Sequence, residues 1–336
     1  MRRLCWIFPM LVLVAAAHAR NADGVLELVI TPNNGAPVII GSGGTFEATL
    51  TQRASLRLIR ADGTALDLDP EWTELPGGIL RATCKTSPGL DLGPYALEAS
   101  ADGRADTNVR SVYVSEILVD YAIVHITDVH IGKANRDPAP DIVFQRLIQH
   151  INGVKPAFVL ISGDLTENGE PEQFRRFFEV LDTCVLPTFV CPGNHDRQGV
   201  NYENTFGPLV YSIQYGVDGY LVFDTKDFVI ADDLDAQVGE LQRLRRAMKP
   251  SRWSIGMTHR YDPSMSMRSQ LVLFVDDPLD YLIFGHWHSE NDYKTVPWGT
   301  TPVVVTPAAV DGAWRLILVT QAGILPQEVQ TLESLK

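Results

Sequence analysis

The chain has 336 residues, of which 45% are hydrophobic and 21% are charged, a balance typical of soluble globular proteins. This length exceeds one ordinary domain and allows a large buried core. The formal net charge of −13 opposes the neutralisation of phosphates on which non-specific binding to DNA or RNA depends, so no nucleic-acid polymer is expected as a partner.

Residues 1–19 have the features of a cleaved signal peptide. Arg2 and Arg3 precede an apolar run of 14 residues, which is short for a transmembrane helix, and Ala17-His18-Ala19 is a small-x-small cleavage motif. Cleavage after Ala19 predicts a periplasmic or secreted protein that keeps no transmembrane segment, and a signal anchor is the alternative. The mature formal net charge becomes −15, because 26 basic residues then face 41 acidic ones.

The mature chain retains three cysteines, Cys84, Cys184 and Cys191. This odd number allows at most one internal disulfide. The extended run PTFV before Cys191 places it beyond disulfide reach of Cys184, so we expect buried free thiols.

Residues 22–115 are predicted to form a small all-β domain. Alternating runs such as TFEATL and SLRLIR are separated by turn signals such as Asp62-Gly63, with a spacing near ten residues. This spacing predicts an immunoglobulin-like β-sandwich. The region contains no catalytic cluster, and its role is open between contact with carbohydrate or cell wall, a lid over the next domain, and a passive spacer.

From residue 117 onward, strand-like runs alternate with amphipathic helices. The strand-like runs include YAIVHI, AFVLIS, PTFVC, WSIGMT and YLIFGH, and helices are expected at 141–152, 171–182 and 235–249. Such alternation predicts an α/β domain, at residues 118–325, in which ligands bind beyond the strand ends.

Polar side chains follow five of these strands. They are Asp128 and His130, then Asp164, then Asn194, His195 and Asp196, then His259, and last His286 and His288. Five of the seven mature histidines are among them. One such motif alone carries little weight, because turns and cores often contain it. Five in order, each at a strand end, indicate a site.

The spacing and the donor types of these residues predict a metal centre. In an extended segment residues i and i+2 point to one side, so each Asp-x-His or His-x-His pair is expected to direct two ligands to one point. Gly163, Gly193 and Gly285 allow the backbone to approach closely. Carboxylate, imidazole and amide donors suit Fe, Mn or Zn. Six ligands and a bridging carboxylate are more than one ion requires and predict two ions, about 3.5–4 Å apart.

The ordered motifs TDVH, SGDLTENG, PGNHD, MTHR and FGHWH resemble those of the calcineurin-like metallophosphoesterases. The resemblance covers residues 120–319, and SGDLTENG and the proline before GNHD resemble the cyclic-nucleotide phosphodiesterase-like branch. It implies a two-sheet α/β sandwich with the metals at the sheet ends.

The resemblance also implies a role for each polar residue. The first metal would be held by Asp128, His130 and His288, the second by Asn194, His259 and His286, with Asp164 bridging the two. His195 would stay unligated and would stabilise or protonate the leaving oxygen, with Asp196 orienting it. A hydroxide shared by the metals would attack phosphorus in line.

Some positions depart from the pattern of relatives. Purple acid phosphatases have a tyrosine ligand three residues after the Gly-Asp aspartate, and here that residue is Glu167, so no purple colour is expected. Many relatives have His-His-Pro in the fourth motif, whereas His259 is followed by Arg260 here. We expect His125, inside the first strand, to be a core or second-layer residue. Trp287 is open between stacking on a substrate base and simple packing.

We therefore expect an exported hydrolase of phosphoric esters that uses two Fe, Mn or Zn ions, with small phosphodiesters favoured over monoesters as substrates. The substrate and the oligomeric state stay open. The alternative is a binding or scaffold protein whose β-sandwich contacts a wall or glycan partner, but such a protein would be expected to lack ligands, and none is missing. A metallopeptidase is disfavoured because the chain has no His-Glu-x-x-His motif.

Overall fold

The computed structural model describes residues 25–225, 234–261, 271–290, 294–296 and 299–335. The predicted signal peptide lies outside these residues. Among the described helices, none is both long and apolar enough to cross a bilayer.

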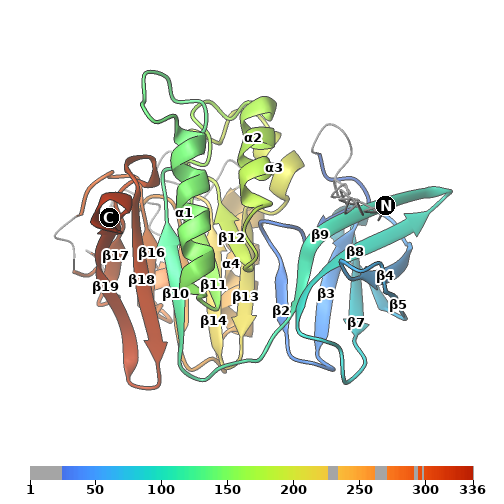
Figure 1. The fold of residues 1–336 in the computed structure, drawn as a ribbon. Helices are drawn as coiled ribbons and strands as arrows, with labels where there is room; N and C mark the ends of the chain where they lie inside the picture. Colours follow the sequence, from blue (N-terminus) through green and yellow to red (C-terminus); the bar gives the residue numbers. More distant parts are fainter. Residues whose placement is uncertain (1–24, 226–233, 262–270, 291–293, 297–298, 336) are drawn as a thin grey trace, which may run out of the picture.

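Residues 29–114 form two sheets around one apolar core (Figure 1). Their strands are β1 (Val29–Thr31), β2 (Val38–Ile40), β3 (Thr45–Leu50), β4 (Ser55–Ile59), β5 (Ala65–Leu68), β6 (Glu71–Glu74), β7 (Leu80–Lys85), β8 (Gly93–Ala101) and β9 (Arg104–Val114). The sheet orders are β1-β3-β7-β6 and β2-β9-β8-β4-β5. Buried and exposed residues alternate along β3, because one face of each sheet packs inward.

Two five-stranded sheets follow, in the orders β12-β11-β10-β18-β19 and β13-β14-β15-β16-β17. The strands of the first sheet are β10 (Tyr121–Ile126), β11 (Phe158–Ser162), β12 (Thr188–Cys191), β18 (Ala313–Thr320) and β19 (Gly323–Thr331). Those of the second are β13 (Val210–Tyr215), β14 (Asp218–Phe223), β15 (Ser254–Met257), β16 (Tyr281–Phe284) and β17 (Val303–Val305).

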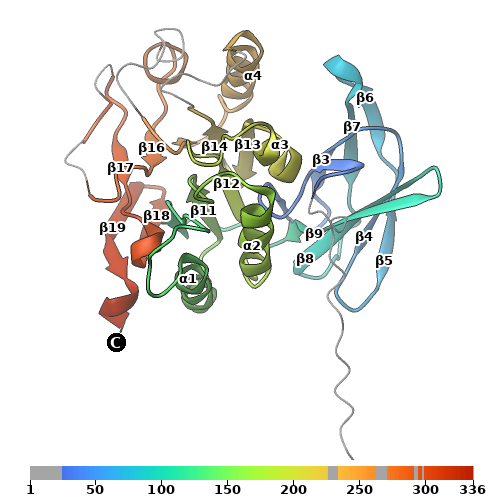
Figure 2. The same ribbon diagram turned by 90° about the horizontal axis from the view of Figure 1, so that it is seen from above.

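Helices cover the outer face of each of these sheets (Figure 2). They are α1 (Pro140–Val154), α2 (Pro171–Leu181), α3 (Asn201–Phe206) and α4 (Leu234–Ala247). Elsewhere in the chain, short helical turns occur at Pro76–Gly78, Leu271–Val275, Ala309–Asp311 and Leu332–Leu335. α1 and α2 pack on the first sheet and α4 packs on the second. Buried residues such as Ile123, Phe189 and Ile255 fill the space between the sheets. The predicted α/β organisation is confirmed.

The sequence of α1 explains its position. Val143, Phe144, Leu147, Ile148 and Ile151 recur at helical spacing and are all buried against the sheet. Pro140 occupies the first turn, where its missing N–H removes no helical hydrogen bond. The expected helix at 141–152 is therefore confirmed, with slightly wider bounds.

Parallel pairing brings the ends of the motif-bearing strands together. β10 pairs in parallel with β11, and β11 with β12. In the second sheet β14, β15 and β16 are parallel as well. The loops that follow these strands therefore gather at one edge of the sandwich.

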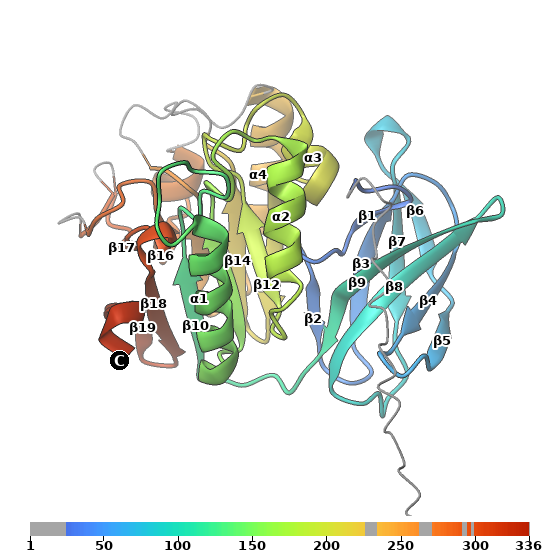
Figure 3. The same cartoon turned by 45° about the horizontal axis from the view of Figure 1, so that its top comes forward.

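The two N-terminal sheets, formed by residues 29–114, contact the α/β part along β12 (Figure 3). The amide of Val190 donates to the carbonyl of Gly35 over 2.8 Å, so the turn after β1 adds a short parallel bridge to the edge strand. Ile39 and Tyr113 join the apolar cluster between the two α/β sheets. Cys84, Cys184 and Cys191 are buried and free, as expected.

Candidate metal centre

The loops after β10 and β11 run side by side beyond the ends of their strands. The amide of Asp128 donates to the carbonyl of Gly163 over 3.0 Å, and that of His130 to the carbonyl of Asp164 over 2.9 Å. The parallel register of the strands thus continues into the loops, and it fixes Asp128 and His130 opposite Asp164.

Five site residues have left-handed backbone conformations. Asp128, His130, Asp164, His286 and His288 have φ values of 57°, 53°, 48°, 73° and 56°. Non-glycine residues rarely adopt this region, and each costs of the order of 1 kcal/mol or more. The expectation that the Asp-x-His and His-x-His pairs converge through extended backbone was wrong. Each pair converges because both of its members turn left-handed where the chain must leave the sheet.

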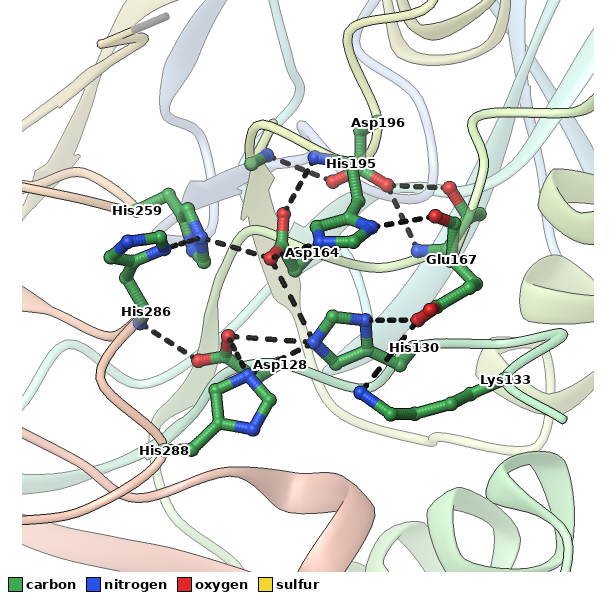
Figure 4. Close-up of polar contacts among 12 residues, drawn as sticks. Asp128, His130, Lys133, Asp164, Glu167, His195, Asp196, His259, His286 and His288 are labelled. Atoms are coloured by element: carbon green, nitrogen blue, oxygen red, sulfur yellow. Dashed lines mark hydrogen bonds and ion pairs between the residues drawn. The ribbon is translucent and has the colours of Figure 1, made fainter. Parts of the chain in front are cut away.

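Two groups of side chains that share no residue result, and they are close to each other (Figure 4). One contains Asp128, His130 and His288, and the other contains Asp164, His259 and His286. His195 forms a third group, which overlaps both, with His130 and Asp164. In the first group, Nε2 of His288 lies 3.1 Å from Oδ1 of Asp128 and 3.1 Å from Nε2 of His130. In the second, Nε2 of His259 lies 3.2 Å from Oδ2 of Asp164 and 3.3 Å from Nδ1 of His286. Oδ2 of Asp164 is also 3.8 Å from Nε2 of His130, so this carboxylate faces both groups.

The donor atoms of the site fit metal cations. Oδ1 of Asp128 and Oδ1 of Asn194 are buried, and neither accepts a hydrogen bond from the described residues. Buried oxygens without a donor are uncommon in folded proteins. Asn194 directly precedes His195, whose amide donates to Oδ1 of Asp164 over 2.9 Å. Converging oxygen and imidazole donors suit first-row transition metals.

Neighbouring groups orient these donors. Nδ1 of His259 donates to the carbonyl of Ser162 over 2.8 Å, which turns Nε2 toward Asp164. Oδ2 of Asp128 accepts hydrogen bonds from the hydroxyl of Thr127 and the amide of His286, which leaves Oδ1 facing the histidines. Oε2 of Glu167 lies 2.7 Å from Nδ1 of His130. The sequence reading noted Glu167 only as a replaced tyrosine and missed this contact.

The carboxylates of the site stay ionised although they are buried. Burial raises the pKa of Asp128, but the opposing charge of His259 and contacts with His130 and His288 outweigh it and hold the pKa well below its usual value. Burial likewise opposes ionisation of Asp164, and its net pKa is lowered, mainly by His259. The site therefore presents two anionic carboxylates in a water-poor setting, which favours cation binding.

His195 lies at the edge of the cluster, with 37% of its side chain exposed. Its Nδ1 donates to the carbonyl of Glu167 over 2.6 Å, and its Nε2 is 4.0 Å from Oδ2 of Asp164. The ring is therefore fixed with Nε2 directed toward the cluster.

Asp196 has a different role from the predicted one. Its carboxylate is fully buried and accepts hydrogen bonds from the amides of Leu165, Thr166 and Gly193. The prediction that Asp196 is catalytic and orients His195 was wrong, because the carbonyl of Glu167 holds that imidazole. Asp196 instead ties the loop after β12 to the loop after β11.

His125 is a core residue, as expected. It is fully buried, and its ring nitrogens lie 2.7 Å from the hydroxyl of Thr306 and 2.8 Å from that of Ser162. Burial lowers its pKa to about 3, so the ring is neutral. Trp287, between two site histidines, is 42% exposed.

Comparisons with known proteins agree with this geometry. A family model described as calcineurin-like phosphoesterase matches residues 121–290. A protein of Vesicomyosocius okutanii named "Probable cyclic nucleotide phosphodiesterase" is 24% identical over 195 residues, which are 52% of this chain and 82% of that protein. A protein of Arcobacter nitrofigilis named "Probable glycerophosphodiester phosphodiesterase GpdQ" is 32% identical over 81 residues, which are 22% of this chain and 30% of that protein.

Among solved structures, the purple acid phosphatase PPD1 of yellow lupin seeds has a similar fold. The TM-score is 0.54 at 14% sequence identity, and the match covers 85% of this chain and 69% of that one. At this identity the similarity concerns the fold alone.

Proposed function

The chain belongs to the calcineurin-like phosphoesterase family, and from that membership we propose that it is an exported phosphodiesterase with two metal ions. It is a hydrolase of phosphoric ester bonds, with diesters favoured. The observation that carries the proposal is the pair of ligand groups that face the shared carboxylate of Asp164.

The ligand sets follow these two groups. We assign Asp128, His130 and His288 to one ion, Asn194, His259 and His286 to the other, and Asp164 to both. Iron, manganese and zinc all suit these donors. Two such ions supply an activated water nucleophile and neutralise negative charge on the phosphoryl oxygens.

The protein residues contribute orientation and proton transfer. Because a carbonyl only accepts hydrogen bonds, the contact with Glu167 places a proton on Nδ1 of His195. A second proton, on Nε2, makes the ring cationic, and this proton can pass to the leaving oxygen of the substrate.

A small diester is the substrate class we favour. The two named relatives carry names of enzymes for cyclic nucleotides and glycerophosphodiesters, both of which are phosphodiesters. The formal net charge of −13 disfavours long polyanions but not a small anion at a local cationic site.

We also propose the division and location of the chain that the sequence favours: a signal peptide at 1–19, a β-sandwich domain at 22–115 and a catalytic domain from 118, whose predicted end at 325 moves to 331 because β19 pairs with β18. Export is tested by expression of the full chain in a bacterium, followed by fractionation and intact mass measurement. A mature N-terminus at Arg20 in the extracytoplasmic fraction is expected, and an unprocessed cytoplasmic chain would contradict export.

One experiment tests the activity. The purified chain is loaded with Mn, Fe or Zn, its metal content is measured, and hydrolysis of aryl phosphodiesters, phosphomonoesters and cyclic nucleotides is compared. We expect about two ions per chain and faster hydrolysis of diesters. A chain with neither metal nor activity would refute the proposal.

The Asp164→Asn variant tests the bridging role of this carboxylate. Asparagine keeps the shape of the side chain but removes the charge that faces both ligand groups. We expect turnover to fall at least about 100-fold, with metal content below that of the wild type. Unchanged turnover would contradict the bridging role.

A further inference from the structure

Glu167 contacts two site histidines through two different groups. Its carboxylate oxygen Oε2 lies 2.7 Å from Nδ1 of His130, a proposed metal ligand. Its backbone carbonyl accepts the N–H of Nδ1 of His195, the proposed proton donor, over 2.6 Å. The two imidazole rings lie 4.9 Å apart, edge to face. Figure 4 shows Glu167 beside both rings, on the side away from His259 and His286.

The backbone of Glu167 is held from both sides. Its amide donates to the carbonyl of Ile131 over 2.9 Å, and Ile131 forms a parallel bridge with Thr166. The buried carboxylate of Asp196 holds the amides of Leu165 and Thr166. Glu167 therefore occupies a fixed position relative to the loops that follow β10, β11 and β12.

The carboxylate of Glu167 is not placed as a direct ligand. It contacts Nδ1 of His130, whereas Nε2 of the same ring faces Asp128, Asp164 and His288. Nδ1 and Nε2 lie on different edges of the imidazole. Among the described residues, the groups of side chains that could hold a metal ion do not include Glu167. Nζ of Lys133 lies 3.9 Å from Oε2.

We propose that Glu167 is a positioning residue that fixes the two histidines by separate means. Its carboxylate, in contact with Nδ1, sets the tautomer and the ring orientation of His130, so that Nε2 is the free donor. Its carbonyl sets the ring of His195. This inference rests on the proposed function, because it concerns the same metal centre. It adds that the side chain governs metal affinity whereas the main chain governs proton donation.

The separation of the two contacts gives a selective test. Glu167→Ala deletes the carboxylate but keeps the carbonyl, and Glu167→Gln keeps an oxygen acceptor without the charge. Glu172→Gln is the matched control, because Glu172 lies nearby in α2 with its side chain 76% exposed. The probe is Zn²⁺ or Mn²⁺ alone, and the affinity of each site is measured by competition with a chromogenic chelator.

We expect the affinity of one of the two sites to fall about 10- to 100-fold in Glu167→Ala and less in Glu167→Gln. The other site and the Glu172→Gln variant should match the wild type. Wild-type affinity at both sites in Glu167→Ala would overturn the inference and leave the proposed function standing. A wild-type chain that binds neither ion would refute the proposed function itself.

A second readout separates positioning from general loss of structure. The dependence of the rate on the leaving group reports proton donation, so it should be unchanged in Glu167→Ala and steeper in His195→Ala. A steeper dependence in Glu167→Ala would contradict the assigned division. If Glu167→Ala does not fold, Glu167→Gln carries the same two measurements, and wild-type values in both would again overturn the inference.

Discussion

At the scale of single residues, His195 combines a partly exposed side chain with a ring held in place. His195 and His288 have 37% and 36% of their side chains exposed, whereas His259 is almost fully buried. The imidazole of His195 is held by a main-chain carbonyl, which no side-chain substitution nearby removes. A fixed and partly exposed ring suits the proton-donor role proposed for His195.

The His195→Ala variant tests this role. We expect wild-type metal content and a fall in kcat of about 100- to 10,000-fold, because a positioned proton donor contributes roughly that much. The loss should be greatest for substrates with poor leaving groups, which depend most on protonation. Metal analysis and kinetics on a series of aryl diesters provide the measurement. Loss of both ions would show that His195 is a ligand instead.

Asp224 makes the stability of the fold depend on pH. It follows β14, is almost fully buried, and its Oδ2 lies 3.1 Å from Nε of Arg197. Burial raises its pKa to about 7, although Arg197 opposes this. The unfolded chain loses this proton near pH 4, and the folded chain loses it only near pH 7. Stability from this group is therefore full at low pH and is lost as the pH rises between these values.

Asp224→Asn should remove this contribution. We expect the free energy of unfolding of the wild type to fall between pH 5 and pH 7.5, by an amount of the order of 1 kcal/mol or more, and the variant to show a flatter profile. Urea unfolding at the two pH values, without added metal, measures the difference. Equal slopes in both proteins would contradict the raised pKa.

At the scale of structural elements, the glycines at the strand ends let the ligand loops approach one another. A Cβ at Gly285, after β16, would lie 1.8 Å from the hydroxyl oxygen of Thr127. That hydroxyl oxygen lies 2.7 Å from Oδ2 of Asp128 and 2.8 Å from the carbonyl oxygen of Ser162. Any side chain at position 285 must therefore displace the loop after β10 or the loop that carries His286.

We expect Gly285→Ala to lower the metal affinity and to destabilise the fold by roughly 1–3 kcal/mol, as overpacking does. Gly153→Ala is the control, because a Cβ there meets no atom within 4 Å and the residue lies in α1. Alanine in a helix should instead stabilise by about 0.4–1 kcal/mol. Thermal melting and chelator competition measure both variants. Wild-type affinity in Gly285→Ala would show that the loops adjust freely.

The elements also show what the sequence could and could not predict. Strand-end positions of the ligands were predictable, because apolar runs of strand length end directly before each motif. The left-handed backbone of Asp128 or His130 was not, because it depends on contacts with a neighbouring loop. The same holds for Asp196, whose partners lie about 30 residues away in sequence.

The last strand was missed for a local reason. β19 contains Pro326, and its polar residues do not alternate regularly with its apolar ones, so it shows no clear strand pattern. It lies at the edge of its sheet and pairs only with β18, where a missing N–H is tolerated. Tertiary pairing thus outweighs a weak intrinsic preference for strand.

At the scale of the whole molecule, the two N-terminal sheets contribute side chains to the apolar core of the catalytic part. Ile39 and Tyr113 are buried in the cluster between the two α/β sheets, and the hydroxyl of Tyr113 donates to the carbonyl of Leu186 over 3.1 Å. The side-chain amide of Asn34 donates to Asp182 over 2.7 Å. Contacts of this kind distinguish a structural partner from a passive spacer.

The contact with β12 also reaches toward the metal centre. Val190 donates to Gly35, and Val190 lies four residues before Asn194 in the chain. β12 is the edge strand of its sheet, so the turn after β1 covers an edge that would otherwise be unpaired. The N-terminal sheets therefore support the strand that carries Asn194 and His195.

A chain truncated to residues 116–336 tests this support against the chain from residue 22. Truncation exposes the apolar surface around Phe189 and frees the edge of β12, so we expect aggregation, or a Tm lower by at least about 5 °C with weaker metal binding. Solubility, thermal melting and chelator competition measure these changes. An equally stable truncated chain with wild-type affinity would contradict the supporting role. It would favour a β-sandwich that acts as a spacer or binds a wall or glycan partner.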